Sequence, residues 1–289
     1  MKILVLGGSG MLGHQLYREF AQDYDVWVTL RRDAAPFVQR GLFRPDRVLA
    51  RVDAMDFAGV EAVLRAVAPA VVFNCIGIIK QLKAAKDPIP SLTLNSLLPH
   101  RLARVCGEIG ARLVHFSTDC VFSGLKGGYR ESDVADAEDL YGRTKFLGEV
   151  GDAPHALTVR TSIIGRELGT AHSLVDWFLS QRGGQVRGYR RAIYTGFTTL
   201  EMARIVRMLV ARQPSLHGLW QVASTPISKY DLLNLLRDAC RVPVEILPFD
   251  DFVCDRSLDG SRFAAATGYR APAWPTMIAE MADADKSDL

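Results

Sequence analysis

A tyrosine and a lysine lie four residues apart in the segment "DLYGRTKFLGE", at Tyr141 and Lys145. On a helix this spacing places the two side chains on one face, one turn apart. A phenol with an ordinary pKa of about 10 is a poor proton donor at neutral pH, and a neighbouring ammonium group improves it by stabilising the phenolate. The pair is a candidate general acid with its activating cation, and the alternative is two solvated residues of a surface helix.

A glycine-rich turn, "GGSGMLG", follows the apolar run "ILVL" at the start of the chain. Glycines let the backbone bend tightly and approach a pyrophosphate, whose charge is bound by the free N–H groups of the following helix. The segment therefore predicts a dinucleotide site at Gly7, Gly10, Met11, Leu12 and Gly13. A tight strand-to-helix turn without a ligand is the alternative.

The next apolar run ends in "TLRRD", where an NAD site usually has an acidic residue that binds the ribose hydroxyls. Arg31 and Arg32 suit a 2′-phosphate better, so the sequence favours NADP(H). Asp33 could instead bind a hydroxyl and the arginines could be merely solvated, which leaves NAD(H) open. Asp53 is a candidate hydrogen-bond acceptor for adenine, with an N-cap of the following helix as its alternative.

Strand-length apolar runs alternate with helical patterns through the first half of the chain, which predicts an α/β fold with a Rossmann-type, doubly wound parallel sheet. We expect residues 1–165 to form the NADP-binding domain. Residues 166–289 are expected to form mainly a smaller substrate-binding lobe, with short strands such as "GLWQVAS" and some segments that return to the first domain. We also expect a kink or break at Pro99 and a frayed polar tail at "DADKSDL".

Composition excludes several classes of protein. The five cysteines form no CxxC pair and no Cys/His cluster, which argues against a disulfide scaffold and predicts no metal site. A net charge of +3 gives no sign of a nucleic-acid or membrane partner. The first apolar stretch is too short for a signal peptide or a membrane span, so we expect a cytoplasmic protein.

Three further segments follow one another along the chain: "STDCVF" from Ser117, "YGRTKFLGE" from Tyr141 and "RTS" from Arg160. With the glycine turn, they resemble the extended short-chain dehydrogenase/reductase family, and most closely its dTDP-4-dehydrorhamnose reductase branch. Asn74 and Asn95 also stand where that branch has asparagines. The resemblance covers nearly the whole chain, including "YTGFTTLEM" and "DRSLDGSRF".

The resemblance implies NADPH-dependent reduction of a nucleotide-linked 4-keto-6-deoxy sugar of the kind used to build cell-surface polysaccharide. It implies that Thr118 holds the substrate carbonyl and that Tyr141 donates the proton. It also implies that Asn74, Tyr141 and Lys145 contact the cofactor. By analogy it also places five residues at the substrate, the last three at its diphosphate: Asp119, Cys120, Arg256, Ser261 and Arg262. Surface salt bridges are the alternative for the two arginines.

The sequence also departs from this branch. Cys120 replaces the glutamate that sugar-nucleotide dehydratases need, which disfavours dehydration, and it replaces the tyrosine usual in the reductases. Bulky Ile76, Ile78 and Ile79 are expected to border the nicotinamide and leave the sugar undefined. A sugar-nucleotide epimerase and a non-catalytic regulatory subunit that binds NADP and a partner enzyme remain alternatives, and a homodimer is left open.

Overall fold

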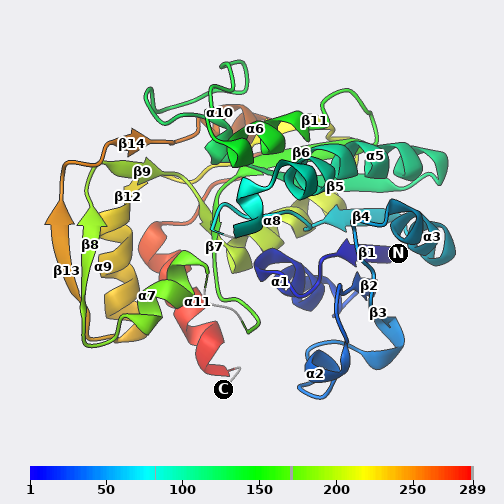
Figure 1. Ribbon diagram of the computed structural model, residues 1–289, viewed down its shortest axis with the longest axis horizontal. Helices are drawn as coiled ribbons and strands as arrows, with labels where there is room; N and C mark the ends of the chain where they lie inside the picture. Colours follow the sequence, from blue (N-terminus) through cyan, green and yellow to red (C-terminus); the bar gives the residue numbers. More distant parts are fainter. Residues whose placement is uncertain (82, 170–171, 288–289) are drawn as a thin grey trace. The chain divides into compact units, whose positions relative to one another are not determined.

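The computed structural model describes residues 1–81, 83–169 and 172–287 (Figure 1). The chain forms two compact units. Unit 1 comprises Met1–Ser117, Asp139–Val159 and Ala203–Leu219, and unit 2 comprises Thr118–Glu138, Arg160–Met202 and Trp220–Leu289. The chain thus passes between the units more often than the expected boundary at 165/166 requires.

A seven-stranded sheet in the order β11-β6-β5-β4-β1-β2-β3 is built mainly from unit 1. Its strands are β1 (Lys2–Leu6), β2 (Asp25–Thr29), β3 (Val48–Leu49), β4 (Val71–Asn74), β5 (Arg112–Thr118), β6 (Ala156–Thr161) and β11 (Gly218–Gln221). Strands β3, β2, β1, β4 and β5 pair in parallel, which confirms the expected Rossmann-type α/β fold. Strand β11, from the segment "GLWQVAS", extends this sheet beside β6, although its last two residues belong to unit 2.

Helices cover both faces of the sheet because alternate residues of each strand are buried on opposite sides. On one side, Phe20 of α1 (Met11–Phe20) packs against Phe73 of β4 with ring centroids 5.0 Å apart. Helix α8 (Thr199–Arg212) lies beside α1, since Arg207 pairs with Glu19 and Asp23. On the other side, α3 (Phe57–Val67) and α5 (Leu98–Glu108) share a core with Leu4, Leu6 and Leu113.

The expected kink at Pro99 takes the form of a change of helix type. Helix α4 (Pro88–Ser91) runs into a π-helical segment, η3 (Leu92–Leu97), and α5 begins at Leu98. Pro99 therefore lies in the first turn of α5, where the fixed φ of proline suits the start of an α-helix. Asn95 and Ser96, on the π segment, are buried and contact α6 (Leu140–Leu147).

Strands β1 and β4 end side by side at the carboxyl edge of the sheet, and β5 pairs with β4 there. Leu6 of β1 is in register with Asn74 of β4, and Asn74 is in register with His115 of β5. The strand order reverses here, because β1 continues to β2 on one side and neighbours β4 on the other. Such a switch point is where open α/β sheets bind ligands.

Unit 2 contains three small sheets, with orders β10-β7, β12-β9-β14 and β13-β8. Their strands are β7 (Ile163–Ile164), β8 (Gln185–Tyr189), β9 (Ala192–Tyr194), β10 (Phe197–Thr198), β12 (Ile227–Ser228), β13 (Glu245–Phe249) and β14 (Cys254–Asp255). Its helices include α7 (Leu174–Ser180), α9 (Lys229–Cys240), α10 (Ser261–Thr267) and α11 (Trp274–Ser287). The frayed tail is a wrong expectation up to Ser287, since α11 continues to that residue. No helix among the described residues is long and apolar enough to cross a membrane.

Candidate functional site

The glycine turn joins β1 to α1 and is shaped by its missing side chains. Gly7 has a φ of 83°, a left-handed conformation that favours glycine. A Cβ on Gly13 would lie 2.2 Å from the carbonyl oxygen of Gly7. Gly10 caps α1 without a side chain, and the first helical hydrogen bond runs from His14 N to the Gly10 oxygen. The amides of the first helical residues, 11–13, therefore precede that bond, and this donor set suits a pyrophosphate.

Gly13→Ala is expected to lower the free energy of unfolding by about 2–3 kcal/mol, because the clash is with backbone that cannot rotate away. Chemical denaturation of the protein without cofactor measures this loss. Gly151→Ala is the matched control, since its Cβ would meet nothing within 4 Å. Equal stability of the two variants would contradict the close approach of Gly13 to Gly7.

The end of β2 presents the residues expected to choose between NADP(H) and NAD(H). Arg31 and Arg32 are exposed. One carboxylate oxygen of Asp33, Oδ1, accepts a hydrogen bond from Ala35 N at 3.1 Å. The alternative role of Asp53 as a helix cap does not occur: Asp56 caps α3, and Asp53 is exposed with Oδ1 bound to its own turn.

Tyr141 and Lys145 lie on α6, one turn apart as expected for a helix. Asp139 caps this helix by accepting a hydrogen bond from Gly142 N at 2.9 Å, and Lys80 pairs with the second oxygen of Asp139 at 2.8 Å. Tyr141 is half-buried, whereas Lys145 is buried with 6% of its surface exposed.

The Lys145 ammonium is fixed against the sheet. Its Nζ donates to the carbonyl oxygen of Phe116, on β5, at 2.7 Å. Burial lowers the pKa of Lys145 to about 8, and the charge of Glu149 opposes that shift. The protein thus holds a desolvated cation one helical turn from a tyrosine, as a lysine-activated acid requires.

Buried amides behind this pair fix the loop after β4. Asn95 accepts from Ile78 N at 2.8 Å and donates to Thr144 of α6 at 3.3 Å. Asn74 Oδ1 accepts from Ile76 N at 3.2 Å. The two asparagines therefore hold the loop and α6 in place. Ile78, expected beside the nicotinamide, is instead buried in the core of unit 1.

His115, which the sequence reasoning did not consider, lies beside Asn74 in the structure. It is 1% exposed, its Nδ1 lies 3.1 Å from Asn74 Nδ2, and burial is the main cause that lowers its pKa well below the usual value. A neutral imidazole can accept from the Asn74 amide and so fix its orientation. A polar residue at a buried position of the apolar segment "RLVHFST" was the available signal.

Thr118 ends β5, and its hydroxyl bonds locally. Oγ1 donates to Asp119 Oδ1 at 3.0 Å and accepts from Cys120 N at 3.1 Å, which caps the 3₁₀ turn η4 (Asp119–Val121). Asp119 is 6% exposed, and burial raises its pKa against the charges of Lys229 and Arg256. Cys120 is half-buried.

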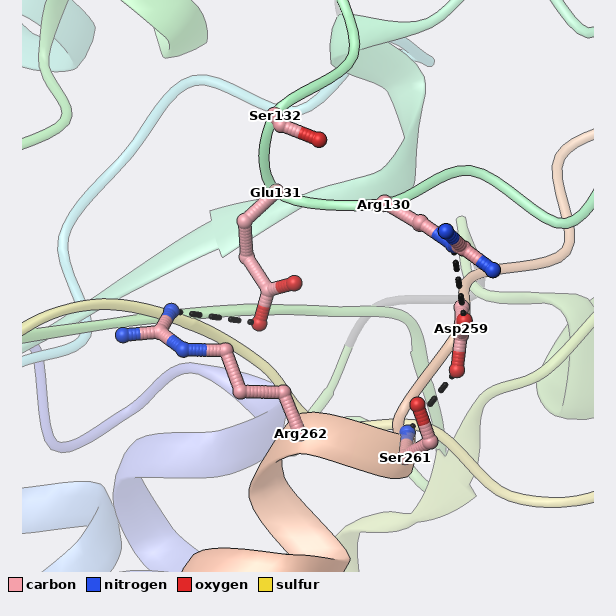
Figure 2. A pocket seen from close by; sticks show the side chains of 6 residues that line it. All are labelled: Arg130, Glu131, Ser132, Asp259, Ser261 and Arg262. Carbon is pink, nitrogen blue, oxygen red and sulfur yellow. Dashed lines mark hydrogen bonds and ion pairs between the residues drawn. The ribbon is translucent and has the colours of Figure 1, made fainter.

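Unit 2 also contains a cavity of about 550 Å³ (Figure 2), lined by Arg130, Glu131, Ser132, Asp259, Ser261 and Arg262. Arg262 reaches Glu131 at 3.5 Å and lies over the Trp220 ring at 3.8 Å. Arg130 pairs with Asp259 at 3.2 Å, and Asp259 accepts from Ser261 N at 2.9 Å. Each arginine of the cavity has an acidic partner, so a diphosphate bound there would compete with a carboxylate.

Arg256 is not among the residues that line this cavity. Its Nε donates to the carbonyl oxygen of Phe122 at 2.8 Å, and its guanidinium also reaches Ser123 O at 3.3 Å. The three residues expected at the diphosphate are therefore split, with Ser261 and Arg262 at the cavity and Arg256 beside the turn that follows β5. Among the described residues, no group of His, Cys, Asp or Glu could hold a metal ion.

The chain is similar to proteins with two different names. It is 30% identical to mouse methionine adenosyltransferase 2 subunit beta over 96% of this chain and 88% of that protein. The match to the bovine subunit covers 51% of this chain and only 41% of that protein. It is also 28% identical to the dTDP-4-dehydrorhamnose reductase of Mycobacterium tuberculosis, over 63% of this chain and 60% of the enzyme.

Solved structures with the same fold include a dTDP-4-dehydrorhamnose reductase and an enzyme bound to NAD and UDP. The dTDP-4-dehydrorhamnose reductase of Bacillus anthracis, solved with NADP, superposes with a TM-score of 0.79 at 20% identity, over 97% of this chain and 98% of that one. The Bordetella bronchiseptica enzyme WbmG, solved with NAD and UDP, gives 0.78 at 19% identity, over 99% and 95%. At these identities the likeness shows the fold alone.

The model of the RmlD substrate binding domain matches residues 1–252. That match covers the glycine turn, the Tyr141/Lys145 helix and most of unit 2. The resemblance noted in the sequence is thereby confirmed at the level of the family. The chain belongs to the RmlD substrate binding domain family.

Proposed function

We propose that this protein is a cytoplasmic NADPH-dependent reductase of a nucleotide-linked 4-keto-6-deoxy sugar. The observation that carries the proposal is the Lys145 ammonium, buried and bound to Phe116 O one helical turn from Tyr141. Burial of a lysine charge costs stability, so its position beside a tyrosine supports a functional role for the pair.

In this proposal Tyr141 gives its phenolic proton to the alkoxide that forms as the carbonyl is reduced. Bound NADPH supplies the hydride. Lys145 stabilises the resulting phenolate, and Thr118 orients the carbonyl through its hydroxyl. To do so, Thr118 must turn its proton from Asp119 Oδ1 to the substrate.

The residues present fit a dinucleotide phosphate. The amides that begin α1 would hold the pyrophosphate, and Arg31 and Arg32 would hold the 2′-phosphate. The two exposed arginines at the end of β2 support NADPH over NADH.

The double variant Arg31→Ala/Arg32→Ala is expected to weaken NADPH binding by about tenfold or more, through loss of charge-assisted hydrogen bonds. Binding of NADH is expected to change little. Titration of cofactor fluorescence measures both affinities, and Arg40→Ala/Arg44→Ala serves as a control for general loss of positive charge in unit 1. Equal losses for the two cofactors would contradict the 2′-phosphate role.

A regulatory subunit is the second candidate, and the match over nearly the full length of the mouse subunit favours it. Such a subunit would bind the dinucleotide and a partner enzyme without reducing a sugar. The two candidates are separated by NADPH oxidation with dTDP- and UDP-linked 4-keto-6-deoxy sugars. Turnover with either sugar supports the reductase, while tight NADPH binding without turnover contradicts it for these substrates.

A further inference from the structure

Lys229, in unit 2, lies where its positive charge is energetically unfavourable. Lys229 is the first residue of α9, where the positive end of the helix dipole disfavours a cation. It is only partly exposed, and burial lowers its pKa. Its Nζ lies 3.8 Å from the centre of the Tyr194 ring. Within the described part of the chain, the ammonium group has no hydrogen bond or ion pair to another side chain or carbonyl.

The strand register explains how this contact arises. β12 pairs antiparallel with β9, with Ile227 opposite Tyr194, so Lys229 is the diagonal neighbour of Tyr194 on the same face. β14 pairs in parallel on the other side of β9, and Arg256 continues its register to lie beside Tyr194. One face of the β12-β9-β14 sheet therefore gathers Lys229, Tyr194 and Arg256.

Tyr194 is held rigidly but leaves its hydroxyl unused. Its ring packs on Trp274 with centroids 5.4 Å apart, and Trp274 Nε1 donates to Thr225 O at 2.8 Å. The side chain is 3% exposed, and its hydroxyl has no hydrogen-bond partner among the described residues. Buried polar groups normally have a hydrogen-bond partner. A hydroxyl and an ammonium group that lie together without one therefore indicate a ligand.

The charges around Lys229 indicate what that ligand is. Asp119 is close enough to raise the pKa of Lys229, and Arg256 is close enough to lower it. Arg256 is already bound to two backbone carbonyls. A carboxylate or phosphate would be attracted by Lys229 and repelled by Asp119. A neutral hydroxyl avoids this conflict, because it can accept from the ammonium group and donate to the carboxylate or the phenol oxygen.

We propose that Lys229 is a specificity-determining residue that donates a hydrogen bond from Nζ to a ring hydroxyl of the substrate hexose, with Tyr194 as second partner. The choice of a nucleotide-linked hexose rests on the proposed function. The role of Lys229 itself rests on the Nζ donors, which have no hydrogen-bond acceptor among the described residues.

The test compares binding of a nucleotide with binding of the same nucleotide carrying a hexose. Calorimetry at saturating NADPH would use dTDP against dTDP-glucose and UDP against UDP-glucose, which have a hydroxyl at C4 and are not reduced. The dissociation constant of the free nucleotide divided by that of the nucleotide-hexose reports the affinity gained from the hexose contacts alone. Lys229→Met is expected to reduce this ratio by about 10- to 100-fold and to leave the affinities for the free nucleotide and NADPH unchanged.

Lys126→Met is the matched control. Lys126 is also in unit 2 and lies over a tyrosine ring, that of Tyr129, at 5.7 Å, but its ammonium group is already paired with Asp133 at 2.5 Å. This control is expected to leave the ratio unchanged. Lys229→Gln keeps an N–H donor, so its ratio is expected to lie between those of Lys229→Met and the wild type.

Three outcomes would overturn the inference. They are an unchanged ratio in Lys229→Met, a parallel loss of nucleotide and NADPH affinity that marks a structural role, and a wild-type protein that binds neither hexose probe more tightly than its nucleotide. The result is independent of the reductase assay. If hexose binding depends on Lys229 but no turnover occurs, the reductase is rejected and the role of Lys229 is supported. If turnover occurs but Lys229→Met leaves the ratio unchanged, the reductase is supported and the role of Lys229 is rejected.

Discussion

Tyr141→Phe is expected to lower the rate of sugar reduction by about 10²–10⁴-fold, the range that a positioned general acid contributes. The substitution removes only the phenolic O–H and keeps the ring on α6. Without that proton, the alkoxide formed on reduction has no adjacent acid. Initial rates of NADPH oxidation at saturating sugar measure the effect.

Tyr24→Phe is a suitable control, because it removes a hydroxyl from a ring that packs on Phe20 in unit 1, away from α6. It is expected to leave the rate unchanged. NADPH affinity is expected to stay within about threefold in both variants, since each retains its ring. A Tyr141→Phe variant with wild-type turnover would assign the proton donor to another group.

Lys145→Met is expected to act in opposite directions on activity and stability. Loss of the cation should lower the rate of reduction by about 10²-fold or more, because the phenolate of Tyr141 is no longer stabilised. The apo protein should become more stable by about 1–2 kcal/mol at pH 7. A pKa lowered from 10.5 to about 8 represents roughly 3 kcal/mol of unfavourable burial, offset by about 1 kcal/mol for the lost hydrogen bond to Phe116 O.

The same group makes stability depend on pH. Because the pKa of Lys145 is lower in the folded state, the unfolded chain binds more protons between about pH 8 and pH 10.5. The free energy of unfolding should therefore gain a contribution from Lys145 as the pH rises through that window, and this contribution should be absent from the variant. The rate of reduction in the wild type should instead fall above about pH 8, as the ammonium group loses its proton.

Denaturant unfolding at pH 7 and pH 10, together with a pH–rate profile, tests both effects. A Lys145→Met variant that is less stable than the wild type at pH 7 would contradict the cost assigned to the buried charge. A variant with full activity would contradict its role. Lys2→Met is a matched control for stability, since Lys2 also donates to a backbone carbonyl, that of Val67 at 2.7 Å, but lies at the start of β1.

The sequence predicts the large sheet well because strands such as β1 and β4 are almost entirely apolar. The run "ILVL" lies in β1, and the run that ends in "TLRRD" begins with β2. Helix α8 has the sequence "TLEMARIVRMLVAR", whose apolar residues recur at helical spacing. The pattern is reliable here because strands covered on both faces must be apolar at nearly every position.

Other features depend on tertiary contacts that no local pattern encodes. Strand β11 is short, and only its pairing with β6 assigns it to the large sheet. The π-helical segment η3 is stabilised where Asn95 and Ser96 bind α6. α11 has a polar end that local composition marks as a tail, yet it continues as a helix to Ser287.

The candidate site was partly predictable for the same reason. Tyr141, Lys145 and the glycine turn are local patterns whose spacing survives folding. The neighbours that tune them are not local: Phe116 O lies 29 residues from Lys145 in sequence, and Asn95 lies 49 residues from Thr144. The contact of Lys229 with Tyr194 could likewise not be predicted from the sequence, because it depends on the register of β12 on β9.

The most direct test of the central claim follows the hydride. NADPH carrying deuterium at the nicotinamide C4 is incubated with the wild-type protein and a dTDP- or UDP-linked 4-keto-6-deoxy sugar, and the product is examined by mass spectrometry and NMR. The reductase account expects one NADPH oxidised per sugar consumed and deuterium at C4 of the product. An altered sugar formed without NADPH consumption, or no reaction while NADPH binds tightly, would contradict it.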